Sequence, residues 1–135
     1  MALQYSTTHR NNGLADITTQ AGTAAHLAIY TGAAPANCGT ADAGTLLVSL
    51  PMSNPIAAAP SGGVLTMSAI TATAAAATGT AAHWRIYPTA TTTGTDAVAQ
   101  GTVGTSGADL NFPSVSFTSG ETISVSSFTI TANGA

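Results

Sequence analysis

The fold is decided by the stretch His26-Leu27-Ala28-Ile29-Tyr30-Thr31, in which side chains alternate in character from one residue to the next. A period of two residues is typical of a β-strand, because successive side chains point to opposite faces. Leu27 and Ile29 therefore share one face, and His26 and Tyr30 share the other. The stretch predicts a strand with one face in a core and one face turned outward.

The same alternation recurs in Ala82-His83-Trp84-Arg85-Ile86-Tyr87, which places Trp84 and Ile86 inward and the three polar side chains outward. About eight short strands follow from this pattern, with turns between them and no β-α-β rhythm. The whole chain, 1–135, is predicted as a single all-β domain, a β-sandwich or jelly roll with one short N-terminal helix. The remaining strands are predicted at 46–50, 64–70, 98–103, around Leu110–Phe117 and at 122–131. Residues 72–77 are predicted to be extended, and a bulge is predicted at Ser126-Ser127 within the last strand.

Residues 6–20 form the predicted helix. Leu14 and Ile17 recur at helical spacing, and Gly22 stands where a left-handed C-cap belongs. Ser6 is the expected N-cap. The apolar stripe is narrow, so we expect this helix to dock on an edge or end of the sheet through Leu14 and Ile17.

Charge is almost absent from this chain. It has no lysine, two arginines (Arg10 and Arg85) and five acidic residues. Neutralisation of phosphate by Lys and Arg supplies most non-specific affinity for nucleic acid, so nucleic-acid binding is not expected. No apolar run approaches the roughly 20 residues of a membrane helix, and Met1–Thr8 lacks the features of a signal peptide. We therefore expect synthesis in the cytoplasm and no membrane insertion.

No catalytic, cofactor-binding or metal-binding residues are predicted. His9, His26 and His83 are far apart in sequence, and Cys38 has no neighbouring cysteine. Cys38 is expected in a loop, as a free thiol or in an intermolecular disulfide. The segment 104–107 lacks the spacing of a nucleophile elbow or a phosphate loop, and we expect a hairpin turn there, with Asp109 capping a turn.

A candidate protein interface remains. Tyr and Arg are enriched in the cores of protein interfaces. If the two alternating strands are neighbours, their outward side chains form one patch; the alternative is a pair of ordinary solvated strand faces. The patch consists of His26, Tyr30, His83, Arg85 and Tyr87.

Five stretches of the chain form a recurring set: Leu27-Ala28-Ile29-Tyr30-Thr31-Gly32 with Pro35, Leu46-Leu47-Val48-Ser49-Leu50, Gly63-Val64-Leu65, Val103-Gly104-Thr105-Ser106-Gly107-Ala108-Asp109-Leu110 and Phe128-Thr129-Ile130-Thr131. With these stretches the chain resembles small virion proteins of tailed bacteriophages, and more closely the capsid cement or decoration proteins with a jelly-roll-like fold. The resemblance extends over nearly the whole chain, on low-complexity residues.

The resemblance implies a non-enzymatic subunit on the capsid surface of a virion, which binds and stabilises the lattice of the major capsid protein. It also implies a homo-oligomer, dimeric or trimeric, that would fit the symmetry axes of a shell. Two alternatives stay open: a tail-associated or receptor-binding module, and a carbohydrate-binding β-sandwich. Both would be expected to expose aromatic side chains, whereas the only tryptophan, Trp84, is predicted to be buried.

Overall fold

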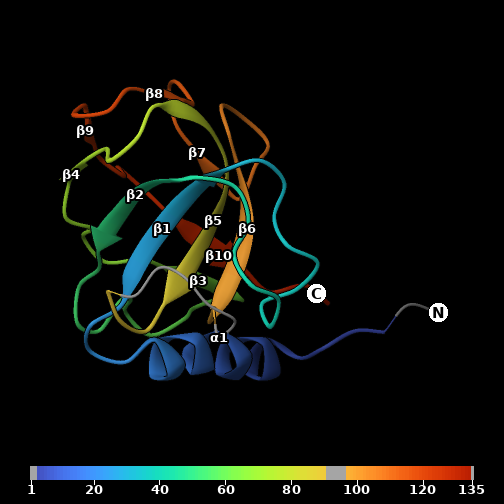
Figure 1. Ribbon diagram of the computed structural model, residues 1–135. Helices are drawn as coiled ribbons and strands as arrows, with labels where there is room; N and C mark the ends of the chain where they lie inside the picture. The colour runs from blue at the N-terminus through green and yellow to red at the C-terminus, as the bar shows by residue number, and fades with distance from the viewer. Residues whose placement is uncertain (1–2, 91–96, 135) are drawn as a thin grey trace.

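The computed structural model describes residues 3–90 and 97–134. The chain folds as an all-β sandwich with one short helix, as the alternation predicts (Figure 1). The larger layer is a sheet in the order β2-β1-β5-β6-β7, with β8 pairing with the start of β5. The second layer consists of two separate strand pairs, β10-β3 and β4-β9.

The strands are short, and most have two to six residues. The bounds are β1 (His26–Thr31), β2 (Leu46–Pro51), β3 (Val64–Thr66), β4 (Thr73–Ala74), β5 (Gly79–Tyr87), β6 (Ala99–Gly104), β7 (Leu110–Asn111), β8 (Ser116–Phe117), β9 (Thr122–Ile123) and β10 (Thr129–Thr131).

The two alternating stretches are neighbours in the sheet. β1 and β5 run antiparallel, with Ile29 opposite Trp84 and Leu27 opposite Ile86. These four side chains and Phe128 are all buried in one hydrophobic cluster, which confirms the predicted core. Trp84 and Phe128 meet edge to face with ring centroids 4.9 Å apart, a favourable aromatic geometry. The alternation of apolar and polar residues along the sequence was sufficient to predict this core.

The predicted helix is present as α1 (Thr7–Ala21), and it lies along one end of the sandwich (Figure 1). The Ser6 side chain accepts a hydrogen bond from the backbone N–H of His9, and Gly22 closes the helix with a φ of 71°. Leu14 is buried, and Ile17 packs against the main core. The helix is thus held through the two side chains that the sequence indicates.

Three local predictions are wrong: a bulge, a hairpin turn and the length of one strand. Residues 122–131 do not form one strand with a bulge, because the chain leaves one strand pair at Ile123 and joins another at Thr129. Ile123 and Phe128 can therefore both be buried, although strict alternation along a single strand would place them on opposite faces. Residues 104–107 do not close a hairpin either, since β6 and β7 run parallel, with Val103 opposite Leu110. The third predicted strand is also shorter than expected and ends at Thr66.

Candidate functional site

The predicted interface patch is assembled by the sheet but is covered. Tyr30 lies opposite His83, and His26 lies opposite Tyr87, so the outward side chains do share one face. Four of them are nevertheless buried: Tyr30, His83, Arg85 and Tyr87 are each at most 3% exposed. The expectation of exposed strand faces is wrong for these four residues. Only His26 is half-buried, and its ring nitrogen Nδ1 lies 3.1 Å from the carbonyl oxygen of Ala24.

The cover is the segment between β1 and β2, residues 32–45, and it is fastened by Arg85. The Arg85 Nη2 donates to the carbonyl oxygens of Asn37 and Thr40, at 3.0 and 2.7 Å. In the same guanidinium group, Nε donates to the Gln100 side-chain oxygen and Nη1 donates to the Tyr87 hydroxyl, both at 3.0 Å. A charged donor with several acceptors can be buried at tolerable cost. Arg85 is therefore a structural clamp in this fold.

Two further polar side chains of the same face fasten the covering segment. Gln100 donates to the carbonyl oxygen of Pro35 at 2.8 Å, and His83 Nδ1 lies 2.7 Å from the carbonyl oxygen of Gly32. The His83 ring also stacks on Tyr30, with centroids 5.0 Å apart and planes 8° apart. Sequence parity places these residues on one face, but it does not reveal that a loop covers that face.

Tyr30 is held in its neutral form. Burial raises the pKa of the Tyr30 hydroxyl far above its usual range, and a hydrogen bond with Tyr87 adds to the rise. The nearby carboxylate of Asp42 acts in the same direction, while the guanidinium of Arg85 opposes it. This titratable cluster therefore serves packing, and its side chains do not face solvent.

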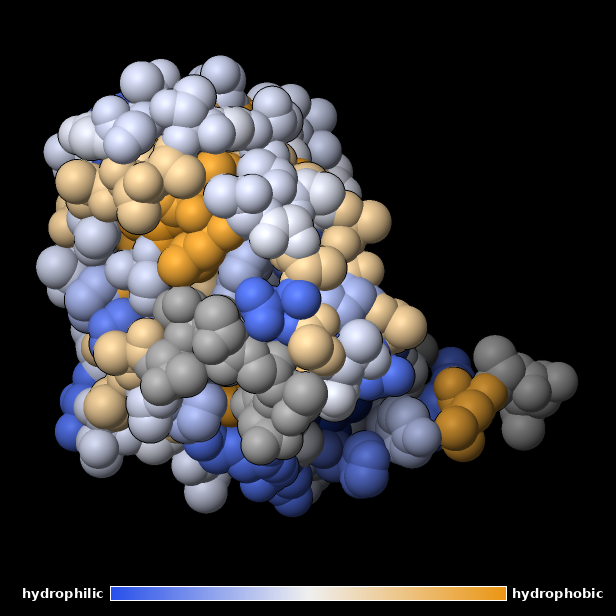
Figure 2. Space-filling model, in the orientation of Figure 1, coloured by the Kyte–Doolittle hydropathy of each residue, from blue (hydrophilic) through white to orange (hydrophobic). Residues whose placement is uncertain are grey.

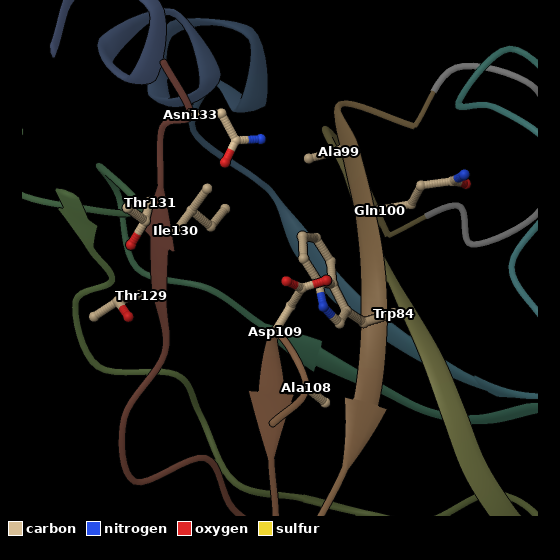
Figure 3. A pocket seen from close by; sticks show the side chains of 9 residues that line it. All are labelled: Trp84, Ala99, Gln100, Ala108, Asp109, Thr129, Ile130, Thr131 and Asn133. Carbon is tan, nitrogen blue, oxygen red and sulfur yellow. The ribbon is translucent and has the colours of Figure 1, made fainter. Parts of the chain in front are cut away.

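A cavity of about 420 Å³ opens elsewhere, between β6 and β10 (Figure 3). It lies on the core face of β6, on the other side of the sheet from Arg85. Small side chains leave the space, and most of its polar groups carry no charge. The lining residues are Trp84, Ala99, Gln100, Ala108, Asp109, Thr129, Ile130, Thr131 and Asn133.

Gly101 allows two of these side chains to approach each other. A Cβ at this position would lie 2.5 Å from Asp109 Oδ2 and 2.7 Å from the Trp84 ring. Asp109 Oδ2 accepts from the backbone N–H of Thr102 at 2.9 Å, which fixes the carboxylate across β6 and β7. Asp109 thus bridges strands, and the predicted role as a turn cap falls to Asn111, whose side chain bonds both backbone groups of Ala108.

Trp84 brings an unusual group to this cavity. Its side chain is 3% exposed, and its indole N–H is buried with no hydrogen-bond partner in the described part of the chain. Figure 3 shows the indole nitrogen and the Asp109 carboxylate facing the same space. The sequence analysis missed this site. Its one signal was Gly101 inside a strand, because an interior glycine often marks a close approach of other groups.

The segment before α1 carries the exposed apolar side chains. Leu3 is 72% exposed and Tyr5 is 43% exposed, and they are the large hydrophobic residues that the described part of the chain leaves open. Tyr5 is anchored by its backbone N–H to the Gly134 carbonyl at 2.6 Å and by stacking on His9. Figures 1 and 2 show the segment projecting from the body of the sandwich.

Within residues 3–90 and 97–134, no group of three or more His, Cys, Asp or Glu side chains is placed to hold a metal ion. Cys38 is a free, half-buried thiol in the covering segment. None of the described helices is long and apolar enough to cross a membrane. No protein-family model, no curated protein and no solved structure matches the chain.

Proposed function

We propose that this chain is a non-enzymatic structural subunit of a phage virion, a cement or decoration protein that binds the lattice of the major capsid protein. The class of partner comes from the resemblance described above. The observation that carries the proposal is the projecting segment with Leu3 and Tyr5. Exposed apolar side chains gathered in one place commonly mark a contact with another protein.

This proposal moves the contact away from the predicted patch. Tyr30, His83, Arg85 and Tyr87 are sealed beneath residues 32–45 and offer no surface to a partner. Leu3 and Tyr5, in contrast, are displayed beside a helix that is docked on the sandwich. A rigid body with a short apolar extension suits a subunit that bridges neighbouring molecules of a shell. A dimer or trimer of the chain would multiply such contacts by avidity.

The contact should be nearly independent of salt. The chain has no lysine, Arg85 is fully buried, and Arg10 is half-buried beside Gly63. Figure 2 shows the most hydrophilic colours along α1, while much of the rest of the visible face is pale. Attraction between exposed charges fades over a Debye length of about 8 Å at physiological salt, whereas apolar burial does not depend on it.

The test is a titration of purified protein onto capsid shells of the encoding phage that lack it, at low and at high salt. Occupancy should be similar in both salts and should fall for Leu3→Ser and for Tyr5→Ser. Thr105→Ala, an exposed change in the turn after β6, is the matched control and should bind like the wild type. Absence of shell binding would refute the cement assignment, and loss of binding at high salt would refute the neutral contact.

The alternative of a tail-associated or receptor-binding module stays a candidate for one reason. The cavity beside Trp84 is a concave site with convergent polar groups, which is the usual form of a small-ligand site. Electron cryomicroscopy of the intact particle distinguishes the two placements, because density for this sandwich lies on the head in one and on the tail in the other.

A further inference from the structure

We propose that the cavity between β6 and β10 binds a neutral, hydroxyl-rich ligand, namely a saccharide unit. This inference is independent of the proposed shell contact, because neither Leu3 nor Tyr5 lines the cavity. Its volume of about 420 Å³ falls within the range of roughly 300–1,000 Å³ that small-molecule sites have. The cavity therefore has room for at least one sugar ring.

The buried indole N–H of Trp84 is the first argument. It lines the cavity, it is enclosed by protein, and it has no acceptor among the described residues. A buried donor left without an acceptor has lost its hydrogen bond to water and gained nothing in return, so such groups are rare without a reason. A ligand oxygen that enters the cavity would accept this hydrogen bond and remove the penalty.

The second argument is the Asp109 carboxylate on the same side of the cavity. One oxygen, Oδ2, is held by the backbone N–H and the hydroxyl of Thr102. The other oxygen points away from β6, toward the gap (Figure 3). A hydroxyl group accepts and donates at once, so sugar hydroxyls can accept from the Trp84 indole and donate to Asp109.

Charge selects against other ligands. Among the described residues of the lining, Asp109 is the only one with an ionisable side chain, and Arg85 lies on the opposite face of the sheet. Phosphates, sulfates and acidic sugars would meet an uncompensated carboxylate. A cation would be attracted to the carboxylate but would leave the indole donor without an acceptor. The other polar side chains that face the cavity are the neutral ones of Thr129, Thr131 and Asn133, which suit hydroxyl groups, whereas the Gln100 side chain is bonded to Arg85 and Pro35 on the other face of the sheet.

The site is expected to recognise the ligand by hydrogen bonds and shape. Trp84 is only 3% exposed, so it offers no open ring face on which a sugar could stack. A carbohydrate-binding module was kept only as an alternative in the sequence analysis, because such a module was expected to have an exposed aromatic platform and Trp84 was predicted to be buried. Ala99 and Ala108 keep the floor of the cavity open.

The chain contains one tryptophan, so a proton–nitrogen correlation spectrum has a single indole peak that reports on this cavity. We would titrate the labelled protein with neutral monosaccharides and short neutral oligosaccharides, and with inorganic phosphate and methylammonium as separate arms. The expected result is a saturable downfield shift of the Trp84 indole proton with at least one sugar. No saturable shift with any sugar, or a shift with phosphate or methylammonium alone, would overturn the proposal.

Two variants locate the binding. Ala99→Leu fills the cavity and should abolish the shift, whereas Ala58→Leu, an exposed alanine in the loop before β3, should leave it unchanged. Trp84→Phe keeps an aromatic ring but removes the N–H, and calorimetry should show affinity reduced by about tenfold. Equal binding by the wild type, Ala99→Leu and Trp84→Phe would refute this site, and folding of each variant is checked by circular dichroism.

Discussion

Replacing Arg85 by Met tests the clamp on the covering segment. Methionine retains an apolar stem of similar length but donates no hydrogen bonds. The substitution removes the donors to the carbonyl oxygens of Asn37 and Thr40, the hydroxyl of Tyr87 and the amide oxygen of Gln100. We expect residues 32–45 to loosen and the sandwich to lose stability.

The size of the effect follows from where each acceptor lies. Asn37 and Thr40 are exposed, so water can replace the guanidinium there, at a cost of about 1 kcal/mol for each carbonyl. The acceptors on Tyr87 and Gln100 are less accessible to water, so the loss of each of these two hydrogen bonds costs about 1–2 kcal/mol. The free energy of unfolding should therefore fall by about 4–6 kcal/mol, a large share of a typical 5–15 kcal/mol.

Arg10→Met is the matched control, since Arg10 is the only other arginine. Its hydrogen bond to the Thr7 hydroxyl is exposed, so the loss should be about 0.5–1 kcal/mol. Urea unfolding followed by the fluorescence of Trp84 measures both variants, and limited proteolysis reports on residues 33–42. If the two variants lose equal stability and residues 33–42 stay equally resistant to protease, Arg85 does not clamp the segment.

Three further predictions follow from the core. Trp84→Ala should lower the free energy of unfolding by about 3–5 kcal/mol in urea unfolding followed by circular dichroism, and solvent-like native emission from Trp84 would contradict its burial. Gly101→Ala should lower the free energy of unfolding by about 1–3 kcal/mol, because the new Cβ meets Asp109 and the indole, whereas Gly13→Ala meets nothing within 4 Å and should raise that free energy by about 0.5–1 kcal/mol. The melting temperature should shift in the same direction for each variant, and the reverse order would refute this packing. Burial raises the pKa of Tyr30, so above a pH of about 10 the unfolded chain loses this proton more readily than the folded one, and stability should fall as pH rises. In alkaline urea titrations Tyr30→Phe should show a shallower fall, and an identical slope would contradict the assignment.

The fold was predictable because alternation is a local property. Leu27, Ile29, Trp84 and Ile86 occupy the core face that parity assigns to them. The helix was predictable for a similar reason, since Ser6 and the glycine after its last turn are local signals. These features depend on neighbours in sequence and need no knowledge of the rest of the chain.

The predicted interface failed because burial of a strand face depends on a distant segment. Nothing within Ala82–Tyr87 indicates that residues 32–45 return over it, and Arg85 in a strand is ordinarily a sign of solvent. The cavity was missed for the same reason, because Asp109 and Trp84 meet only through the parallel pairing of β6 and β7.

The way in which the covering segment is fastened has a consequence for how the sequence can change. Arg85, Gln100 and His83 bind its carbonyl oxygens, and every amino acid carries one. Side chains between the anchors can therefore vary widely while the cover keeps its path. Gly44 is different, because its φ is 76° and a Cβ there would collide with the carbonyl oxygen of Thr31. Exposed positions of this segment, such as Ala33, Ala36 and Ala41, are consequently places where new sequence can be tried without disturbing the sheet beneath, whereas Cys38 packs against the buried side chains of that sheet.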